Sequence, residues 1–389
     1  MDTAKLCPNC MTMSKDGGEC GFCYYEGEPI VNDEHQLPVM SVLSERYVIG
    51  KVLGEGNFGV TYLCYDEKHN TRVAIKEYFP AGFVKRDGKD VVSVTGGETA
   101  YFDRGMKKFK SEADSLAKLS GKPGIVQIRD TFEANGTAYI VMEYVDGTTL
   151  EKRFTIDNIL PEKDLLEMLK PVIKSLGEIH ASGLVHRDIA PDNIIINSDG
   201  AAKLIDFGQA AITDGSGKST MALTKRGYSP EEQFEMDLER QGPWTDVYSL
   251  SAVIFRALTG KEPPDALIRF ANDPLAQIET LFPDGTSKAV KNAIKYGMGL
   301  TPEERTQNAG EFFAELYEGK TSPLADPKSK PHTEKKKKHE KNVVTTPIQK
   351  PDFDINKNVK HSKVNIPALI LGILAVGELA YIIFMFLTK

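Results

Sequence analysis

Cysteine is scarce over most of this chain. Five cysteines occur in 389 residues and four of them lie within the first 23, so a disulfide framework for the body is excluded. The 33 glycines and 21 prolines are too few for a collagen-like repeat. A wholly disordered chain is excluded as well, because 41% of the residues are hydrophobic. The length leaves room for about two to three domains.

Positive charge is also scarce in most of the chain. Residues 1–319 hold 35 basic and 49 acidic residues, a net charge of −14. The basic residues collect between Lys320 and Lys363, where 12 lysines accompany 5 acidic residues. General nucleic-acid binding needs a positive surface, and this acidic body lacks one. We therefore expect no nucleic-acid partner.

The four N-terminal cysteines, Cys7, Cys10, Cys20 and Cys23, form two C-x2-C pairs. Four thiolates complete a tetrahedral zinc site and leave no open position for chemistry. Two disulfides are the alternative, but they suit a secreted domain, and nothing at the N-terminus looks like a signal peptide. Residues 1–26 resemble a zinc ribbon, which would need a structural Zn²⁺ to fold and could bind proteins or regulate the rest.

One long hydrophobic run occurs, near the end of the chain. The 22 residues 366–387 are apolar apart from Glu378. As a helix they would span about 33 Å, enough for a hydrocarbon core of about 30 Å. We predict a transmembrane helix over 365–387, a C-terminal anchor whose lysine-rich flank is cytoplasmic. The alternative, a buried amphipathic helix, lacks a polar face.

The predicted span has an unusual acid and a basic flank. A carboxyl at Glu378 is costly in lipid, which predicts a partner helix and self-association, or else a protonated side chain that the apolar span tolerates. Residues 319–364 have several prolines and few large apolar residues, so they predict a flexible basic linker. Its lysines either contact anionic membrane lipids or are merely solvated.

A glycine-rich segment opens the middle of the chain. Residues 47–60 read YVIGKVLGEGNFGV, two β-like runs joined at Gly54, Gly56 and Gly59. Such a loop lets backbone N–H groups approach phosphates. It could also open a dinucleotide-binding fold, but a strand-like segment follows it where that fold needs a helix. Lys76 ends the strand-like VAIK sixteen residues after Val60, a position suited to binding phosphates.

Two further motifs follow, GLVHRDIAPDN at 183–193 and KLIDFG at 203–208. Together with the glycine loop and VAIK, this ordered set resembles the eukaryotic-like protein kinases, in particular the bacterial serine/threonine branch. The resemblance implies an α+β, bilobal protein kinase fold with a small β-rich N-lobe and a large helical C-lobe. The expected parts are a linker at 27–46 and a kinase domain at 47–318, comprising an N-lobe at 47–142, a hinge at 143–147 and a C-lobe at 148–318.

The resemblance also implies a set of catalytic residues. Transfer of a γ-phosphoryl group relies on positioning and charge neutralisation. Lys76 would bind the α- and β-phosphates of ATP, held by Glu112. Asn193 and Asp206 would supply oxygen ligands to Mg²⁺. Asp188 would orient the substrate hydroxyl and accept its proton.

ATP would contact both lobes. The hinge backbone would read adenine, with Met142 as the gatekeeper. The residues expected to bind ATP are Leu53, Gly54, Glu55, Gly56, Asn57, Phe58, Gly59, Ala74, Lys76, Met142, Glu143, Val145 and Ile195.

Other residues match supporting features of the family. Asp246 would brace the catalytic loop through backbone N–H groups, and Glu232 and Arg305 would form a buried ion pair. The hydroxyl-rich segment 209–227 would be phosphorylated and paired with Arg187, or would stay an unmodified flexible loop.

One departure from the family concerns a cation. Serine/threonine kinases usually carry a lysine two residues after the catalytic aspartate, but this position is Ala190. Seven residues before Glu232, where such kinases usually place a threonine, stands Lys225. The two changes are complementary, so Lys225 would restore the charge, with Arg226 as a less well-placed substitute. The alternative is that Lys225 faces solvent.

These patterns predict a membrane-anchored, single-pass protein serine/threonine kinase at the cell membrane, with its kinase domain in the cytoplasm. It would use ATP and Mg²⁺ to phosphorylate hydroxyls of protein substrates and of its own chain. The rival interpretation is a catalytically silent, ATP-binding pseudokinase scaffold at the membrane.

Overall fold

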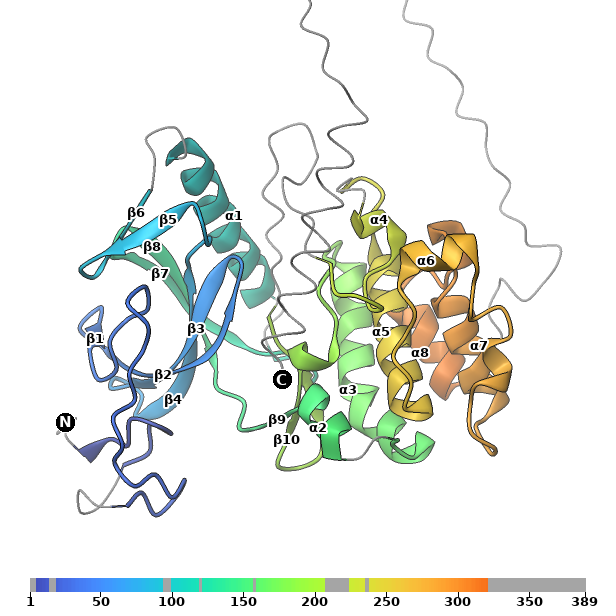
Figure 1. The fold of residues 1–389 in the computed structure, drawn as a ribbon, viewed down its shortest axis with the longest axis horizontal. Coiled ribbons are helices and arrows are strands. Elements are labelled where there is room, and N and C mark those ends of the chain that lie inside the picture. The colour runs from blue at the N-terminus through green and yellow to red at the C-terminus, as the bar shows by residue number, and fades with distance from the viewer. Residues whose placement is uncertain are drawn as a thin grey trace, which may run out of the picture. The chain divides into compact units, whose positions relative to one another are not determined.

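The computed structural model describes residues 5–13, 19–93, 99–118, 121–156, 159–206, 224–234 and 238–320. In this part of the chain a β-rich lobe adjoins a helical lobe (Figure 1). The predicted transmembrane helix, the basic linker beyond residue 320 and most of segment 209–227 lie outside these residues. No helix within them is both long and apolar enough to cross a membrane.

Apolar runs between Val42 and Glu143 form the N-lobe sheet. Six antiparallel strands lie in the order β1-β2-β3-β4-β8-β7, and β5 and β6 form a separate hairpin. Helix α1 packs against β7 and β8 through buried Phe109 and Ala113. The elements are β1 Val42–Leu43, β2 Tyr47–Gly56, β3 Gly59–Asp66, β4 Thr71–Tyr78, β5 Val84–Asp87, β6 Asp90–Ser93, α1 Thr99–Ala117, β7 Ile128–Ala134 and β8 Thr137–Glu143.

The C-lobe is mainly helical. A three-stranded sheet in the order β11-β10-β9 lies at its start. Its elements are β9 Gly147–Thr149, α2 Leu150–Ile156, α3 Glu162–Ala181, β10 Ile194–Asn197, β11 Ala202–Leu204, α4 Glu231–Phe234, α5 Pro243–Thr259, α6 Ala266–Ala271, α7 Lys288–Gly297 and α8 Ala309–Tyr317. Short 3-10 turns occur at Pro191–Asn193, Ile278–Thr280 and Pro302–Glu304.

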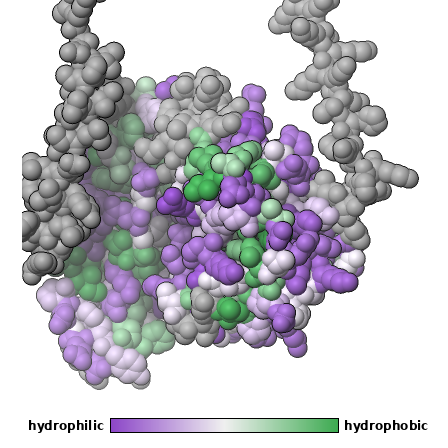
Figure 2. Space-filling view, turned by 45° about the vertical axis from the view of Figure 1, so that its right-hand side comes forward, coloured by the Kyte–Doolittle hydropathy of each residue, from purple (hydrophilic) through white to green (hydrophobic). Residues whose placement is uncertain are grey.

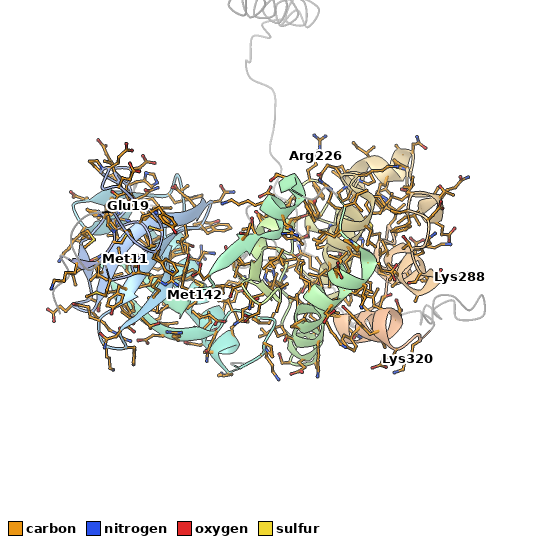
Figure 3. The ribbon with its side chains drawn as sticks, turned by 90° about the horizontal axis from the view of Figure 1, so that it is seen from below. Met11, Glu19, Met142, Arg226, Lys288 and Lys320 are labelled. Carbon is orange, nitrogen blue, oxygen red and sulfur yellow. The ribbon has the colours of Figure 1, made fainter. Side chains whose placement is uncertain are left out.

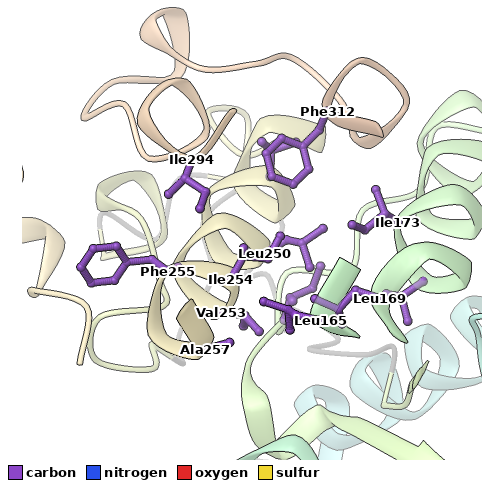
Figure 4. Close-up of a cluster of buried hydrophobic side chains, with 14 of the residues drawn as sticks. Leu165, Leu169, Ile173, Leu250, Val253, Ile254, Phe255, Ala257, Ile294 and Phe312 are labelled. Carbon is purple, nitrogen blue, oxygen red and sulfur yellow. The ribbon is translucent and has the colours of Figure 1, made fainter. Parts of the chain in front are cut away.

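Two predicted helices form the centre of the C-lobe core. The apolar positions of α3, Leu165, Leu169, Val172, Leu176 and Ile179, are all fully buried, as their three- and four-residue spacing predicts. In α5 every residue from Thr245 to Thr259 is buried. Figure 4 shows side chains of α3 and α5 meeting those of Ile294 from α7 and Phe312 from α8. This core supports the loops that follow α3.

The surface contrasts with this core. Figure 2 shows a face that is mostly hydrophilic and carries smaller hydrophobic groups. Exposed apolar side chains include Leu267, Ile268 and Phe270 of α6.

The predicted linker 27–46 is not a free connection in its second half. Leu37 is buried, and its N–H donates to the hydroxyl of Tyr62 in β3 at 3.0 Å. Strand β1 pairs with β2. The linker prediction therefore needs correction here, because this segment completes the edge of the sheet and covers apolar side chains of the N-lobe.

The cysteine-rich unit also packs on the N-lobe. Met11 is fully buried, in a cluster with Leu6, Val48 and Leu63, and Figure 3 labels it in the N-lobe half of the molecule. Nζ of Lys51 in β2 donates to the side-chain oxygen of Asn9 at 2.8 Å, and Asn9 lies between the first two cysteines. The unit therefore shares a core with strands β2 and β3.

Candidate active site

The catalytic loop runs between α3 and β10 and is braced from α5. One carboxylate oxygen of Asp246 accepts the N–H of His186 and the other accepts that of Arg187, each at 2.7 Å. Nε2 of His180 lies 2.9 Å from the same carboxylate. Arg187 has a φ of 67°, a left-handed conformation that costs free energy in a non-glycine residue and needs such support. The predicted brace is confirmed.

A second predicted support is also present. Nη1 of Arg305 lies 2.6 Å from the Glu232 carboxylate, and both side chains are fully buried. The same carboxylate accepts the hydroxyl of Thr245 at 2.8 Å. This ion pair ties α4 to the rest of the C-lobe, so the segment that precedes α4 has a fixed end.

His186 connects the catalytic loop with the segment that bears Asp206. Burial lowers the pKa of His186 to about 4, so the ring is neutral near pH 7. Its Nδ1 accepts the N–H of Asp188 at 3.2 Å, which leaves the proton on Nε2 to be donated to the carbonyl of Ile205 at 3.2 Å. His186 is thus structural.

Asp188 lies among polar partners. One carboxylate oxygen accepts Nδ2 of Asn193 at 2.8 Å, and the other lies 3.3 Å from Nζ of Lys225. Burial raises the pKa of Asp188 to about 6, against the attraction of the Lys225 ammonium. A carboxylate of this pKa is ionised at neutral pH, yet basic enough to accept a proton from a hydroxyl.

Lys76 contacts Asp206 and not Glu112. The Lys76 ammonium forms an ion pair with the Asp206 carboxylate, and within the described residues no ion pair joins Lys76 to Glu112. The predicted Lys76–Glu112 pair is therefore absent from this structure. Burial raises the pKa of Glu112, while the charges of Lys108, Arg187 and Lys76 oppose that rise. The Asp206 carboxylate holds the Lys76 ammonium, so the charge of Lys76 acts on Glu112 without a direct ion pair.

The residues predicted to hold Mg²⁺ offer suitable atoms. Nδ2 of Asn193 is occupied by Asp188, so the side-chain carbonyl oxygen is the atom left for a metal. Burial favours protonation of Asp206, but the Lys76 ammonium overcomes it and holds the pKa of Asp206 low. Carboxylate and amide oxygens are the ligands that Mg²⁺ prefers. The donor set therefore fits the metal.

The glycine loop is the turn between β2 and β3. An added Cβ at Gly54 or Gly56 would meet nothing within 4 Å, which leaves room for phosphates there. At Gly59 it would lie 2.2 Å from the carbonyl oxygen of Glu77, so this glycine is required by packing. The carbonyls of Asn57 and Phe58 accept N–H groups of Ala81 and Phe79 at 2.9 Å, which holds the turn.

Glu55 in this loop has partners that sequence reasoning missed. Its carboxylate lies 2.7 Å from Nε2 of His35 and accepts Nε2 of Gln36 at 2.7 Å. Both partners precede the kinase domain by sequence, and no motif marks them. Glu55 thus anchors the loop through its side chain.

The hinge has open backbone groups. Ala74 in β4 lies opposite Met142 in β8, and both are buried. The side chain of Glu143 accepts Nζ of Lys203. Within the described residues, the N–H and C=O of Val145 make no hydrogen bond, so they are free to read adenine. Leu53 is exposed in β2 and Ile195 lies in β10, one on each lobe.

Lys225 points to the catalytic loop and not to solvent. Its Nζ lies 2.8 and 2.9 Å from the two carboxylate oxygens of Asp192, besides its contact with Asp188. The solvent-facing alternative is therefore wrong. Arg226 has a side chain that is 83% exposed, and Figure 3 labels it at the surface.

The four N-terminal cysteines converge. Their Sγ atoms all lie within 4.8 Å of one another, with Cys7 to Cys23 at 3.6 Å and Cys10 to Cys20 at 3.7 Å. These separations exceed an S–S bond of about 2.05 Å. They match the edge of about 3.8 Å that a tetrahedron with Zn–S bonds of about 2.3 Å would have. The thiols are free, against the disulfide alternative.

The two cysteine turns repeat one geometry. The carbonyl of Cys7 accepts the N–H of Met11 at 2.8 Å, and the carbonyl of Cys20 accepts that of Tyr24 at 2.8 Å. Met11 and Tyr24 both have positive φ angles, 53° and 56°. Such matched turns direct both cysteines of each pair to one point, so the residues present fit a zinc ion.

Known proteins support this interpretation of the kinase site. The chain is 32% identical over 290 residues to the serine/threonine-protein kinase PknB of Mycobacterium leprae, covering 70% of this chain and 43% of the relative. A probable serine/threonine-protein kinase of Clostridium acetobutylicum is 30% identical over 301 residues, covering 74% of this chain and 42% of the relative. The match thus spans less than half the length of these curated relatives.

A solved structure and a family match agree with these relatives. The structure described as PpkA-294 apo form has a TM-score of 0.62 and 32% identity, covering 73% of this chain and all of that chain. The predicted bilobal fold is therefore confirmed. Residues 47–295, more than half of the chain, match the protein kinase domain family. This chain belongs to the family of ATP-dependent protein kinases.

Proposed function

We propose that this protein is a membrane-anchored protein serine/threonine kinase that transfers the γ-phosphoryl group of ATP to protein hydroxyls. The observation that carries the proposal is the group formed by Asp188, Asn193, Asp206 and Lys76. The Asp188 carboxylate accepts Nδ2 of Asn193 at 2.8 Å, and the Lys76 ammonium forms an ion pair with the Asp206 carboxylate. A silent scaffold would not need to retain both the proton acceptor and the metal ligands.

Each of these residues would have a separate role in phosphoryl transfer. Asp188 would accept the proton of the substrate hydroxyl, and Asn193 would keep its carboxylate oriented. Lys76 would exchange Asp206 for the α- and β-phosphates when ATP binds. Asp206 and Asn193 would hold Mg²⁺, which when bound supplies charge neutralisation on the phosphate oxygens. The hinge backbone at Val145 would orient adenine.

Transfer of labelled phosphate tests this activity. The full chain in detergent, supplied with Mg²⁺ and γ-labelled ATP, should label casein and its own chain. Asp188→Asn should lower kcat by about 10²–10⁴ with unchanged ATP affinity, because only the proton acceptor is lost. Asp206→Asn should also abolish most transfer. Wild-type protein that binds ATP and Mg²⁺ but transfers no phosphate would instead support the silent scaffold.

Phosphorylation of its own chain has a structural basis in Arg187. Within the described residues, its buried Nε has no hydrogen-bond partner. A buried guanidinium nitrogen without a partner is costly, and a phosphate on a hydroxyl of segment 209–227 would supply one. We propose that this segment is phosphorylated in the active kinase.

We also propose that Cys7, Cys10, Cys20 and Cys23 bind one structural Zn²⁺. Metal analysis of purified protein should find one zinc per chain, and Cys7→Ser should lose it. Cys64→Ser is the matched control, because Cys64 lies in β3 as a fully buried thiol outside this cluster. Less than half an equivalent of zinc in fresh wild-type protein would contradict the assignment.

The remaining parts of the proposal concern the membrane. Residues 365–387 would anchor the chain as a single span in the cell membrane, with the kinase domain in the cytoplasm. The lysines of 319–364 would contact anionic lipids. Glu378 would favour self-association through the span, since a partner helix relieves its exposure to lipid. The apolar length and the basic flank of this segment support these assignments.

A further inference from the structure

The transferred phosphoryl group needs a cation that Lys76 does not supply. Lys76 serves the α- and β-phosphates in the proposed mechanism, whereas negative charge develops on the γ-phosphoryl oxygens and the attacking hydroxyl next to Asp188. On the catalytic loop, the position two residues after Asp188 holds Ala190, which is buried and uncharged. The site as formed by the catalytic loop alone is thus short of one positive charge.

Lys225 brings that charge from another segment. Its ammonium lies between Asp192, at 2.8 Å, and Asp188, at 3.3 Å. Its side chain is 30% exposed, so it is not sealed within the protein. Burial would lower the pKa of Lys225, but Asp188 and Asp192 outweigh this and raise it, which keeps the lysine charged.

The backbone of Lys225 is also held in place. Its N–H donates to the hydroxyl of Ser229 at 2.9 Å, and its carbonyl accepts the N–H groups of Tyr228 and Ser229 at 3.0 and 2.9 Å. This turn leads directly into α4, which the Glu232–Arg305 pair fixes to the C-lobe. A preorganised cation costs little reorganisation during the reaction, which is what transition-state stabilisation requires.

We infer that Lys225 is a catalytic residue that binds the transferred phosphoryl group and replaces the cation absent at Ala190. The inference rests on the proposed kinase function. In the step, the substrate hydroxyl oxygen forms a bond to the γ-phosphorus while the bond from phosphorus to the β,γ-bridging oxygen breaks. The electron pair of that bond stays on ADP, and the hydroxyl proton passes to Asp188. Lys225 stabilises the negative charge on the phosphoryl oxygens during this transfer.

The test compares substitutions at Lys225 in the full chain, with casein and γ-labelled ATP. Lys225→Met should lower kcat by about 10²–10³, while the dissociation constant of ATP stays within about twofold. Lys225→Arg should retain more of the rate, because a cation remains. The double variant Lys225→Met with Ala190→Lys should have a kcat at least tenfold higher than that of Lys225→Met alone, because either lysine would contact the same phosphate. Arg226→Met is the matched control and should keep full turnover.

Several outcomes would overturn the inference. Full turnover of Lys225→Met would show a lysine without a catalytic role, and a raised turnover would show a contact that inhibits Asp188. A fall in kcat with a lower unfolding temperature and no recovery in the double variant would indicate a structural role. The proposed kinase function survives all three results. It fails separately if the wild-type chain binds ATP and transfers no phosphate.

Discussion

The environment of Asp188 sets the protonation state on which catalysis depends. Burial raises the pKa of its carboxyl to about 6, helped by the negative charge of Asp206 and opposed by Lys225. His186 adds no charge near neutral pH, because its own pKa falls to about 4. At the residue scale, one carboxyl is therefore kept ionised but basic by a balance of burial and two opposite charges.

This balance predicts an acid limb in the rate profile. Below about pH 6 Asp188 is protonated and cannot accept the hydroxyl proton, so kcat should fall about tenfold per pH unit. Above that pH the rate should level off. Phosphate transfer measured from pH 5 to 8 at saturating ATP checks this, with Asp188→Asn as the control that loses the limb. A limb near pH 4 would mean a solvated, unperturbed carboxyl.

At the scale of elements, the cysteine-rich unit and the N-lobe form one packed structure. Met11 is fully buried against Val48 and Leu63, and the ring of Phe22 lies 5.3 Å from the guanidinium of Arg72. Arg72 also pairs with Asp146 in the hinge at 2.8 Å. The stability of the N-lobe is therefore expected to depend on this unit and on the zinc ion that we propose for it.

A pair of methionine substitutions checks that dependence. Met11→Ala should destabilise the N-lobe by about 2–5 kcal/mol, because it removes a fully buried side chain and leaves a cavity. Met13→Ala is the control, since Met13 is 45% exposed and should cost little. Thermal unfolding of the full chain, with and without a zinc chelator, would measure both effects. Equal unfolding temperatures for the two variants would argue against a shared core.

At the scale of the whole molecule, the kinase residues precede the basic segment and the apolar run that we propose as an anchor. Deleting residues 364–389 should move the kinase to the soluble fraction of cells with kcat unchanged, because the residues of the active site and its supports all precede residue 306. Fractionation followed by phosphate transfer measures both quantities. If the truncated chain still pellets with membranes after a salt wash, the anchor assignment is contradicted. If the truncated chain leaves the membranes only after the salt wash, the lysines of the linker also bind lipid.

Much of the fold and site could be predicted from sequence periodicity and from motifs. The buried face of α3 follows from helical periodicity, and the brace by Asp246 and the Glu232–Arg305 pair follow from motifs whose spacing is tied to the kinase fold. The cysteine spacing likewise predicted four sulfurs around one point. The α3 face and the cysteine turns depend on local geometry, so sequence by itself determined them, whereas the two longer-range contacts were expected only from the resemblance to the kinase family.

Other features depend on contacts between distant segments, and only the tertiary structure decided them. Lys76 pairs with Asp206 because burial places these opposite charges together, although motif order suggested Glu112. Glu55 meets His35 and Gln36 only because the preceding segment folds back over the sheet. The sequence left Lys225 between two orientations. The nearby carboxylates of Asp188 and Asp192 resolve the choice, because a half-buried ammonium is stabilised most where opposite charges already lie.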